Sequence, residues 1–419
     1  SMGTEAMFAA CLPNLGDILS QFVPGPPHSD RGYWDRIAED AKARLIAEGE
    51  TALGADWPLL TAKAYRTYTE TGNRSHYQEA YFARRRQLNA LTLAELAEGK
   101  GRFIDALVDG LYLVMEESGW QLPAHNAYER GGKRAPLPDP DRPVLDLFAA
   151  ETGAQLAVIS SVLGDALNSV SPMILQRIDR EINLRITRPY LEQHFWWMGS
   201  GDEPMNNWTA WCTQNVLLST FARPTDQAVR RAVMTKAAHS LDAFVKDYGV
   251  DGACDEGALY YRRAALCLFG ALKIMEMAAP GVFSRIWSEP KIRNMAEFIL
   301  NMNVEGDYYI NFADASAVLD PCGAQEFLFG RAVGSDALCA LAASHALRDP
   351  APELPQEINL FFRLMAISAR PEILTFGERP VHKSDIFYPS CGVFVARDDR
   401  FVVAVKAGDN DDGHNHNDV

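Results

Sequence analysis

The sequence predicts a mainly α-helical protein that ends in the first strands of a β-rich domain. Three observations support this prediction: amphipathic runs fill residues 33–369, short breaks with Pro, Gly or Asp separate them, and β-type residues dominate after about residue 380. Apolar residues at i, i+3 and i+4 spacing are typical of helices that bury one face. We expect a helical domain over residues 1–380 and the start of a second domain over residues 381–419.

Residues 226–247 show the helical pattern clearly, because Val229, Val233 and Leu241 share one face and Thr225 or Asp226 can cap the start. The other predicted helices cover residues 34–48, 77–91, 102–117, 144–163, 172–192, 208–221, 256–277, 282–302, 335–347 and 357–368. Short breaks between long helices favour antiparallel hairpins. A ring of such hairpins, an (α/α) toroid, fits the pattern, and a plain helical bundle is the alternative. The absence of a strict sequence repeat argues against a solenoid.

A β-hairpin is predicted near the end of the sequence. Val, Phe and Tyr are enriched in residues 386–397 and 400–406, on both sides of the turn residues Asp398 and Asp399. An isolated hairpin is only marginally stable. We therefore expect further strands beyond Val419 to complete the sheet.

The formal net charge of −15 argues against a general nucleic-acid binder, which would carry a basic stripe. No uninterrupted apolar stretch is long enough to predict a membrane span. An acidic polymer would need a local basic cleft on this negative protein. Each candidate for such a cleft could equally lie on a solvated helix face. The candidates are Arg84, Arg85, Arg86, Arg185, Arg188, Arg262 and Arg263.

The seven cysteines are odd in number and include no CxxC spacing, which predicts neither a disulfide framework nor a cysteine-rich zinc site. Cys212, Cys267 and Cys339 lie in apolar helical runs and should be buried. These features favour a reducing compartment. No charged segment followed by an apolar one opens the sequence. We expect a protein of the cytoplasm or periplasm of a bacterium.

The strongest local signal is the run Gly-His-Asn-His-Asn-Asp-Val at residues 413–419. On an extended segment His414 and His416 project to the same face. One of them can be catalytic while the other binds a metal, or both can bind a metal. The alternative interpretation is an ordinary polar loop.

Three further segments combine polar and aromatic residues near helix starts. Residues 204–212 place Asn206, Asn207 and Trp208 at the beginning of a helix, where one Asn can simply be an N-cap. Residues 251–262 form an acidic, Gly-containing turn before a helix, in which Glu256 and Tyr260 share a face. Core tyrosines behind an acidic helix start would explain that segment equally well. Residues 120–126, Trp-Gln-Leu-Pro-Ala-His-Asn, form a loop that either lines a cleft or is an ordinary surface loop.

Together these four segments resemble motifs of the heparinase II/III superfamily of polysaccharide lyases. The resemblance extends over essentially the whole chain and is most specific in the His-Asn-His run. It implies an N-terminal (α/α) toroid followed by an antiparallel β-sandwich, with the active cleft between them. It also implies cleavage of an acidic, uronate-containing polysaccharide by β-elimination.

The resemblance assigns roles to individual residues. The Asn that neutralises the substrate carboxylate falls on Asn207, with Asn206 as the alternative, and the catalytic Tyr falls on Tyr261, with Tyr260 as the alternative. The catalytic His falls on His414. A metal-binding His falls on His416, and the other ligands of this structural zinc or calcium ion would lie beyond Val419. The residues expected to bind substrate are Asn206, Trp208, Glu256, Tyr260, His125, Trp120 and Arg262.

These residue types suit β-elimination, which removes the C5 proton of a uronate and expels the C4 oxygen. A neutral amide stabilises the charge that develops on the carboxylate, and one preorganised donor of this kind is worth roughly 3 kcal/mol. A phenol or an imidazole can serve as base or acid, although a phenol at its ordinary pKa of about 10 needs nearby cations to act as a base.

Two other functions fit the sequence less well. A glycoside hydrolase on a toroid would use a carboxylate pair drawn from Asp251, Asp255, Glu256 and Asp314. A non-catalytic polysaccharide-binding protein would leave its ligand intact. The sequence leaves open which polymer is bound and whether the protein forms a homo-oligomer.

Overall fold

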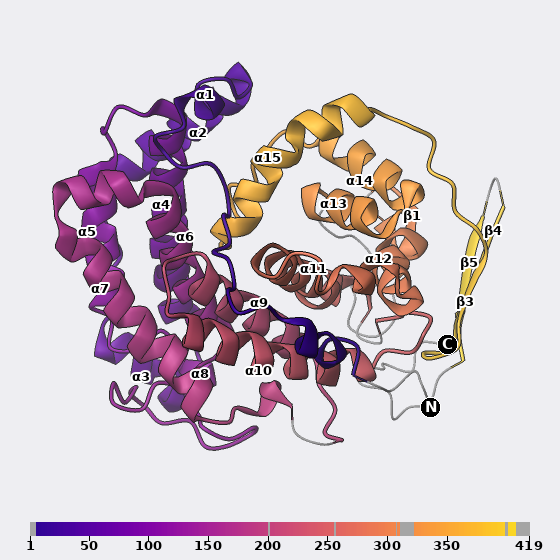
Figure 1. The fold of residues 1–419 in the computed structure, drawn as a ribbon, viewed down its shortest axis with the longest axis horizontal. Helices are drawn as coiled ribbons and strands as arrows, with labels where there is room; N and C mark the ends of the chain where they lie inside the picture. Colours follow the sequence, from indigo (N-terminus) through magenta and orange to yellow (C-terminus); the bar gives the residue numbers. More distant parts are fainter. Residues whose placement is uncertain are drawn as a thin grey trace.

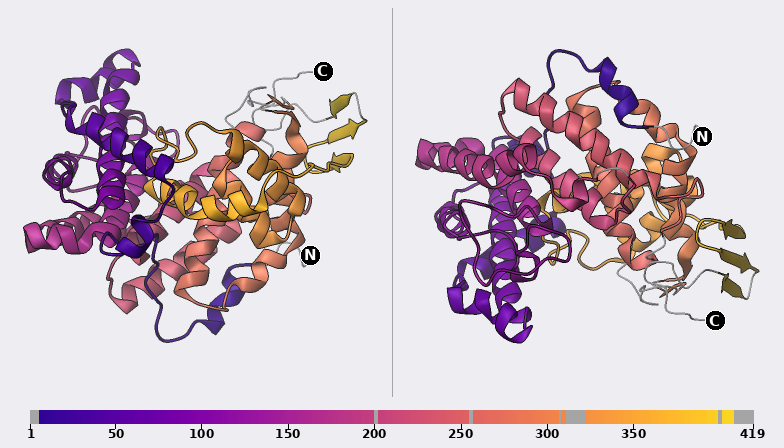
Figure 2. Two further views of the ribbon diagram at one scale, coloured as in Figure 1. Left: turned by 90° about the horizontal axis from the view of Figure 1, so that it is seen from above. Right: turned by 90° about the horizontal axis from the view of Figure 1, so that it is seen from below.

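The computed structural model describes residues 6–199, 202–254, 257–306, 308–310, 322–398 and 401–407, without the side chains of Leu259 and Arg262. The described chain is mainly helical and has a small antiparallel sheet near its C-terminal end, which confirms the fold class at that level. Figures 1 and 2 show helices α1 to α8 at one end of the molecule and the sheet at the other.

The α-helices are α1 Arg31–Trp34, α2 Glu39–Leu53, α3 Ala62–Thr71, α4 Ser75–Glu98, α5 Ile104–Met115, α6 Leu147–Val170, α7 Pro172–Ile182, α8 Arg188–Glu192, α9 Asn207–Phe221, α10 Gln227–Lys246, α11 Tyr261–Ala278, α12 Pro290–Met302, α13 Ala324–Val333, α14 Asp336–Arg348 and α15 Leu360–Phe376. Short 3-10 turns that matter for the site are η3 Pro123–His125, η5 Trp196–Met198 and η6 Ala258–Tyr260. The strands are β1 Asn303–Glu305, β2 Tyr308–Tyr309, β3 Ile386–Tyr388, β4 Val393–Arg397 and β5 Val402–Lys406.

Alternate helices of the chain pack against one another. Helix α4 packs against α6, α6 against α9, α9 against α11, α11 against α13, α13 against α15, and α15 returns to α6. The helices between them, α5, α7, α10, α12 and α14, each pack against the helix that precedes them. The N-terminal ends of α6, α9 and α11 lie close together, because Phe148 of α6 contacts Trp211 of α9 and Arg263 of α11 covers the ring of Trp211.

Helices α6 and α9 form the centre of the core. Nearly every residue of α9 from Thr209 onward is buried. Among the described residues, α6 is the one helix long and apolar enough to cross a membrane, and 78% of its apolar window is buried inside the protein. Its apolar character is therefore explained by its place in the core.

Several predicted helix boundaries are wrong for identifiable reasons. Residues 172–192 do not form one continuous helix, because a π-helical turn at Asn183–Thr187 separates α7 from α8. The run predicted from residue 282 begins with a 3-10 turn at Ser284–Ser288, and the α-helix starts only at Pro290, which occupies the first helical position. Helices α3 and α13 were not predicted, and α3 is short and polar, with only Ala64 and Tyr65 buried.

The predicted hairpin is present as the antiparallel pair β4–β5, and β3 adds a third strand on the other side of β4. The prediction of one continuous strand over residues 386–397 is wrong. Pro389 lacks a backbone donor and Gly392 has a φ of 68°, so the chain turns between β3 and β4. The sheet is fastened to α12, because the Asn301 amide donates to the hydroxyl of Tyr388 at 2.8 Å.

Candidate functional site

Side chains from two of the motif segments meet at the N-terminal ends of α6 and α9. The ring of His125, at the end of η3, lies 4.7 Å from the ring of Trp208 between centroids, and it stacks on Phe148 at 6.2 Å. Phe148 contacts Trp211 at 5.3 Å, and Trp208 contacts Trp196 of η5 at 5.5 Å. We call Trp196, Trp208, His125, Phe148 and Trp211 the aromatic row.

Asp146 fixes the orientation of His125. This aspartate is the N-cap of α6, where one carboxylate oxygen accepts from the Ala149 amide at 2.7 Å. Its other oxygen lies 2.8 Å from Nδ1 of His125 and also accepts from the Leu122 amide. The Asp146 side chain is fully buried, whereas the His125 side chain is 19% exposed. The imidazole is therefore held at one nitrogen and reaches the surface.

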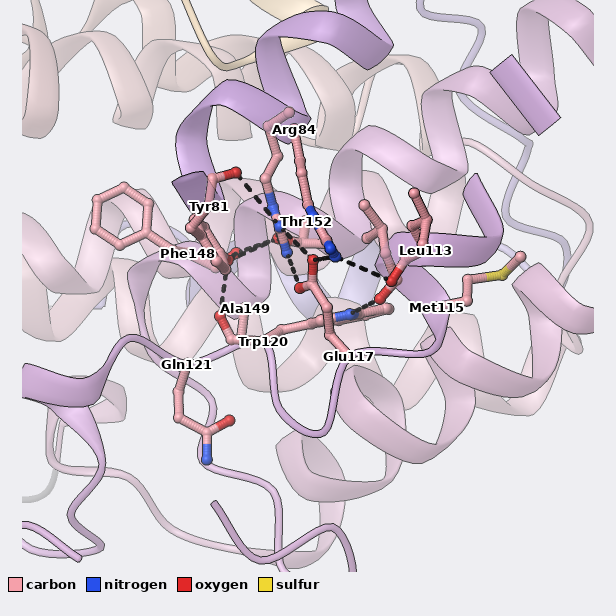
Figure 3. Close-up of polar contacts among 12 residues, drawn as sticks. Tyr81, Arg84, Leu113, Met115, Glu117, Trp120, Gln121, Phe148, Ala149 and Thr152 are labelled. Carbon is pink, nitrogen blue, oxygen red and sulfur yellow. Dashed lines mark hydrogen bonds and ion pairs between the residues drawn. The ribbon is translucent and has the colours of Figure 1, made fainter. Parts of the chain in front are cut away.

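A buried ionic cluster holds the loop that leads to His125 (Figure 3). Arg85 makes two hydrogen bonds of 2.7 and 2.9 Å to the carboxylate of Glu117, and Arg84 adds a third at 3.1 Å. The Tyr81 hydroxyl donates to the carbonyl oxygen of Trp120 at 2.7 Å. These contacts fix residues 117–121 and so fix the start of η3. Arg84 and Arg85 are paired and buried here, which removes them from the candidate basic cleft.

Asn206 and Asn207 differ in what their side chains do. The side chain of Asn206 is the N-cap of α9 and accepts from the Trp208 amide at 2.9 Å. Asn207 is the first residue of the helix, and its half-buried side chain makes no hydrogen bond to another described residue. The amide of Asn207 is therefore the better placed of the two to bind a ligand.

Trp211, at one end of the aromatic row, contacts a buried carboxylate. The indole N–H of Trp211 donates to Oε2 of Glu151 at 2.8 Å, and the amide of Asn359 lies 3.4 Å from the same oxygen. Burial, and then the charge of Glu357, raises the pKa of Glu151 to about 7. The guanidinium of Arg263 lies 4.4 Å over the ring of Trp211. The start of α11 therefore also reaches this site.

A second arginine covers Trp196, at the other end of the aromatic row. The guanidinium of Arg130 lies 4.1 Å over the ring of Trp196 and forms an ion pair of 3.0 Å with Glu203. Both side chains of the ion pair are substantially exposed, at 45% and 38%. Arg130 and Arg263 thus place a positive charge at each end of the aromatic row.

The two tyrosines of the 251–262 segment lie in different environments. Tyr261 is 1% exposed, and its hydroxyl donates to the carbonyl oxygen of Ala296 in α12 at 2.7 Å. Tyr260 ends η6 and is half-buried. Residues 261 and 263 are about 200° apart around a helix, so the face of Tyr261 is turned away from that of Arg263. Because Tyr260 is only half-buried, it is better placed than Tyr261 to contact a ligand.

Trp120 lies beneath the surface rather than in the row. It is 1% exposed, its indole N–H donates to the carbonyl oxygen of Val114, and the Arg185 guanidinium covers its ring at 4.6 Å.

Cavities of about 230 and 370 Å³ flank the loop at Ser118 and Gly119, and Trp120 borders the larger one. Neither of these two cavities is lined by the aromatic row, where the motif residues gather.

Part of the predicted site lies outside the described residues. His414, His416, Glu256, Asp255 and Asp314 belong to this part, as does the side chain of Arg262. In the described ranges no group of three His, Cys, Asp or Glu side chains could hold a metal ion. The expected metal site at His416 therefore stays a prediction.

Sequence reasoning missed Asp146, Glu151, Trp196 and Arg130. Asp146 could have been found from its place just before an apolar helical run, which is typical of an N-cap. The other three carry no local motif and join the site only through tertiary contacts. Comparison with known proteins found neither a matching family model nor a matching curated protein.

Proposed function

We propose that this protein is a polysaccharide lyase that cleaves an acidic, uronate-containing polysaccharide by β-elimination. The observation that carries the proposal is the contact between His125 and Trp208, which brings two separate lyase-like motifs together beside Asn207. In this proposal the helical hairpins between α4 and α15 form an (α/α) toroid. The N-terminal ends of α6 and α9, where the aromatic row lies, form part of the floor of its cleft.

The charge around the aromatic row supports an acidic sugar as ligand. Aromatic faces pack on the C–H groups of sugar rings, and exposed guanidinium groups bind carboxylates or sulfates. Arg130 and Arg263 supply such groups at the two ends of the row, although the whole chain carries a net charge of −15. A local pair of cations on an acidic protein favours selective capture of an anionic polymer.

The proposed chemistry has three roles: stabilising the carboxylate, removing the C5 proton and protonating the leaving oxygen. The amide of Asn207 donates to the uronate carboxylate and stabilises the charge that develops there as the C5 proton leaves. A base takes that proton, the C5–H electrons form the C4=C5 double bond, and the C4–O bond breaks. The leaving oxygen gains a proton from a phenol, for which Tyr260 is better placed than Tyr261. His414 would approach from the β segment as a further base or acid.

The implied metal would stabilise the segment that contains His414 and His416 and would not take part in the reaction. His416 would supply one ligand, and a zinc or calcium ion there would orient the residues around His414. The residues described in the structure all act independently of that ion in this proposal.

Ultraviolet absorbance of the C4=C5 double bond tests the proposal. The protein is incubated with heparan sulfate, chondroitin, hyaluronan and alginate, and absorbance and chain length are followed together. We expect shortening and absorbance to rise in parallel on at least one polymer. Binding without shortening would instead support a non-catalytic binding protein.

A glycoside hydrolase is the second candidate, and one observation favours it. Glu151 is buried beside the row with its pKa raised to about 7, and the charge of Glu357 contributes to the shift. A carboxyl group with a raised pKa beside a second carboxyl group is typical of the general acid of glycoside hydrolases. Chain shortening without new ultraviolet absorbance would identify this activity.

A further inference from the structure

We propose that His125, oriented by Asp146, is a general base for removal of the C5 proton. This inference rests on the proposed lyase function and assigns a catalytic role to a residue expected only to bind substrate. It is carried by the geometry of the Asp146–His125 pair and by its position in the aromatic row.

The Asp146 carboxylate is fixed before any ligand arrives. It accepts from the backbone amides of Ala149 and Leu122 as well as from Nδ1 of His125, and it is fully buried. A carboxylate at Nδ1 holds the proton of a neutral imidazole on that nitrogen, which leaves the lone pair on Nε2. Asp146 is therefore a positioning residue, and Nε2 is the atom that can accept a proton.

The surroundings keep the imidazole in one orientation. Phe148 stacks on one side of the ring, and Trp208 meets it edge to face. The charged groups near it are Asp146 at Nδ1 and Arg134, whose guanidinium donates to the carbonyl oxygen of Ala124 at 2.9 Å, while Arg130 lies farther along the row on Trp196. A base held in place by neighbours loses little entropy on reaching the reactive geometry.

The proton balance of the step is complete without a co-reactant. Nε2 takes the C5 proton, the C–H electron pair forms the C4=C5 double bond, and the C4–O bond breaks toward oxygen. The leaving oxygen gains the proton of the Tyr260 hydroxyl. The imidazolium then returns its proton to solvent, and the phenolate of Tyr260 takes one from solvent.

Three measurements on the full chain test this role, each made on the polymer that the wild type cleaves. His125→Ala should lower kcat about 100-fold or more with KM nearly unchanged, because general base catalysis is worth 10²–10⁴-fold. Added imidazole should restore part of the lost kcat. Asp146→Asn turns an NH2 group either toward the Ala149 N–H or toward the Leu122 N–H and Nδ1 of His125, so it should lower the midpoint of thermal unfolding. In the fraction that stays folded, kcat should fall strongly, because the amide no longer orients the imidazole.

The possible outcomes separate this inference from the proposed function. Turnover near the wild-type value in His125→Ala, or a loss that imidazole does not restore in a folded variant, overturns the role of His125 and leaves the lyase function intact. Full activity of Asp146→Asn overturns the positioning role. A wild-type protein that makes no unsaturated product from any of the polymers overturns both.

Discussion

The hydroxyl of Tyr261 donates a hydrogen bond of 2.7 Å to the backbone carbonyl oxygen of Ala296. This contact joins α11 to α12 inside the core and directs the phenol away from the face that carries Arg263. Its neighbour Tyr260 is only half-buried at the end of η6. We therefore expect Tyr261 to contribute to stability and Tyr260 to take part in the proposed chemistry.

Replacing each tyrosine by Phe distinguishes these tasks. Tyr261→Phe removes a hydrogen bond from the core and should cost about 1 kcal/mol of unfolding free energy while kcat is retained. Tyr260→Phe should unfold like the wild type and lose elimination. Denaturant unfolding and product absorbance measured on both variants check this, and the reverse pattern would return the catalytic role to Tyr261.

A matched pair of variants also separates the two asparagines. Asn207→Ala should lower kcat by roughly 10²–10³-fold, the usual loss for one donor to a developing negative charge, with little change in stability. Asn206→Ala removes the N-cap of α9 and should cost about 1 kcal/mol of stability. Equal kinetic effects of the two substitutions would count against the role of Asn207.

The ion pair between Arg130 and Glu203 predicts opposite effects on substrate affinity. Arg130→Gln removes a cation from the end of the aromatic row and should raise KM for an acidic polymer about two- to fivefold, because exposed ion pairs are worth up to ~1 kcal/mol. Glu203→Gln frees Arg130 from its partner and should lower KM. Steady-state kinetics at low and high salt check this, since screening should reduce both effects. If both variants raise KM alike, the pair has only a structural role.

Glu151 should make stability depend on pH. Its pKa is raised from 4.5 to about 7, so the folded state binds more protons than the unfolded state between these values. Stability should therefore fall as pH rises from about 4.5 to 7, by about 3 kcal/mol, and level off above that range. Glu151→Gln should flatten this part of the profile. Denaturant unfolding at several pH values measures this dependence. A wild-type profile as flat as that of Glu151→Gln would contradict a protonated Glu151 in the folded state.

The sequence predicts the helical part of the fold well, because apolar periodicity reflects local geometry. It does not reveal the π-helical turn at Asn183–Thr187, where periodicity hardly changes, or the break between β3 and β4, which depends on Pro389 and Gly392 acting together. A short, polar helix such as α3 contains too few apolar residues to be distinguished from a loop in the sequence.

The candidate site is predictable only where its residues share a motif. His125, Asn207 and Trp208 were found because they stand in recognisable segments. Trp196 and Arg130 come from η5 and a surface loop, and they reach the row only because residues distant in sequence pack together. Tyr261 is buried and Tyr260 is half-buried because only one face of this segment packs on α12. The sequence does not show which of two adjacent tyrosines lies on that face.

The mass of the products from a defined uronate tetrasaccharide tests the central claim most directly. Elimination adds no water, so the account predicts two fragments whose masses sum to that of the parent, one of them with an unsaturated uronate end. Fragments that together exceed the parent by one water would show hydrolysis and contradict the account.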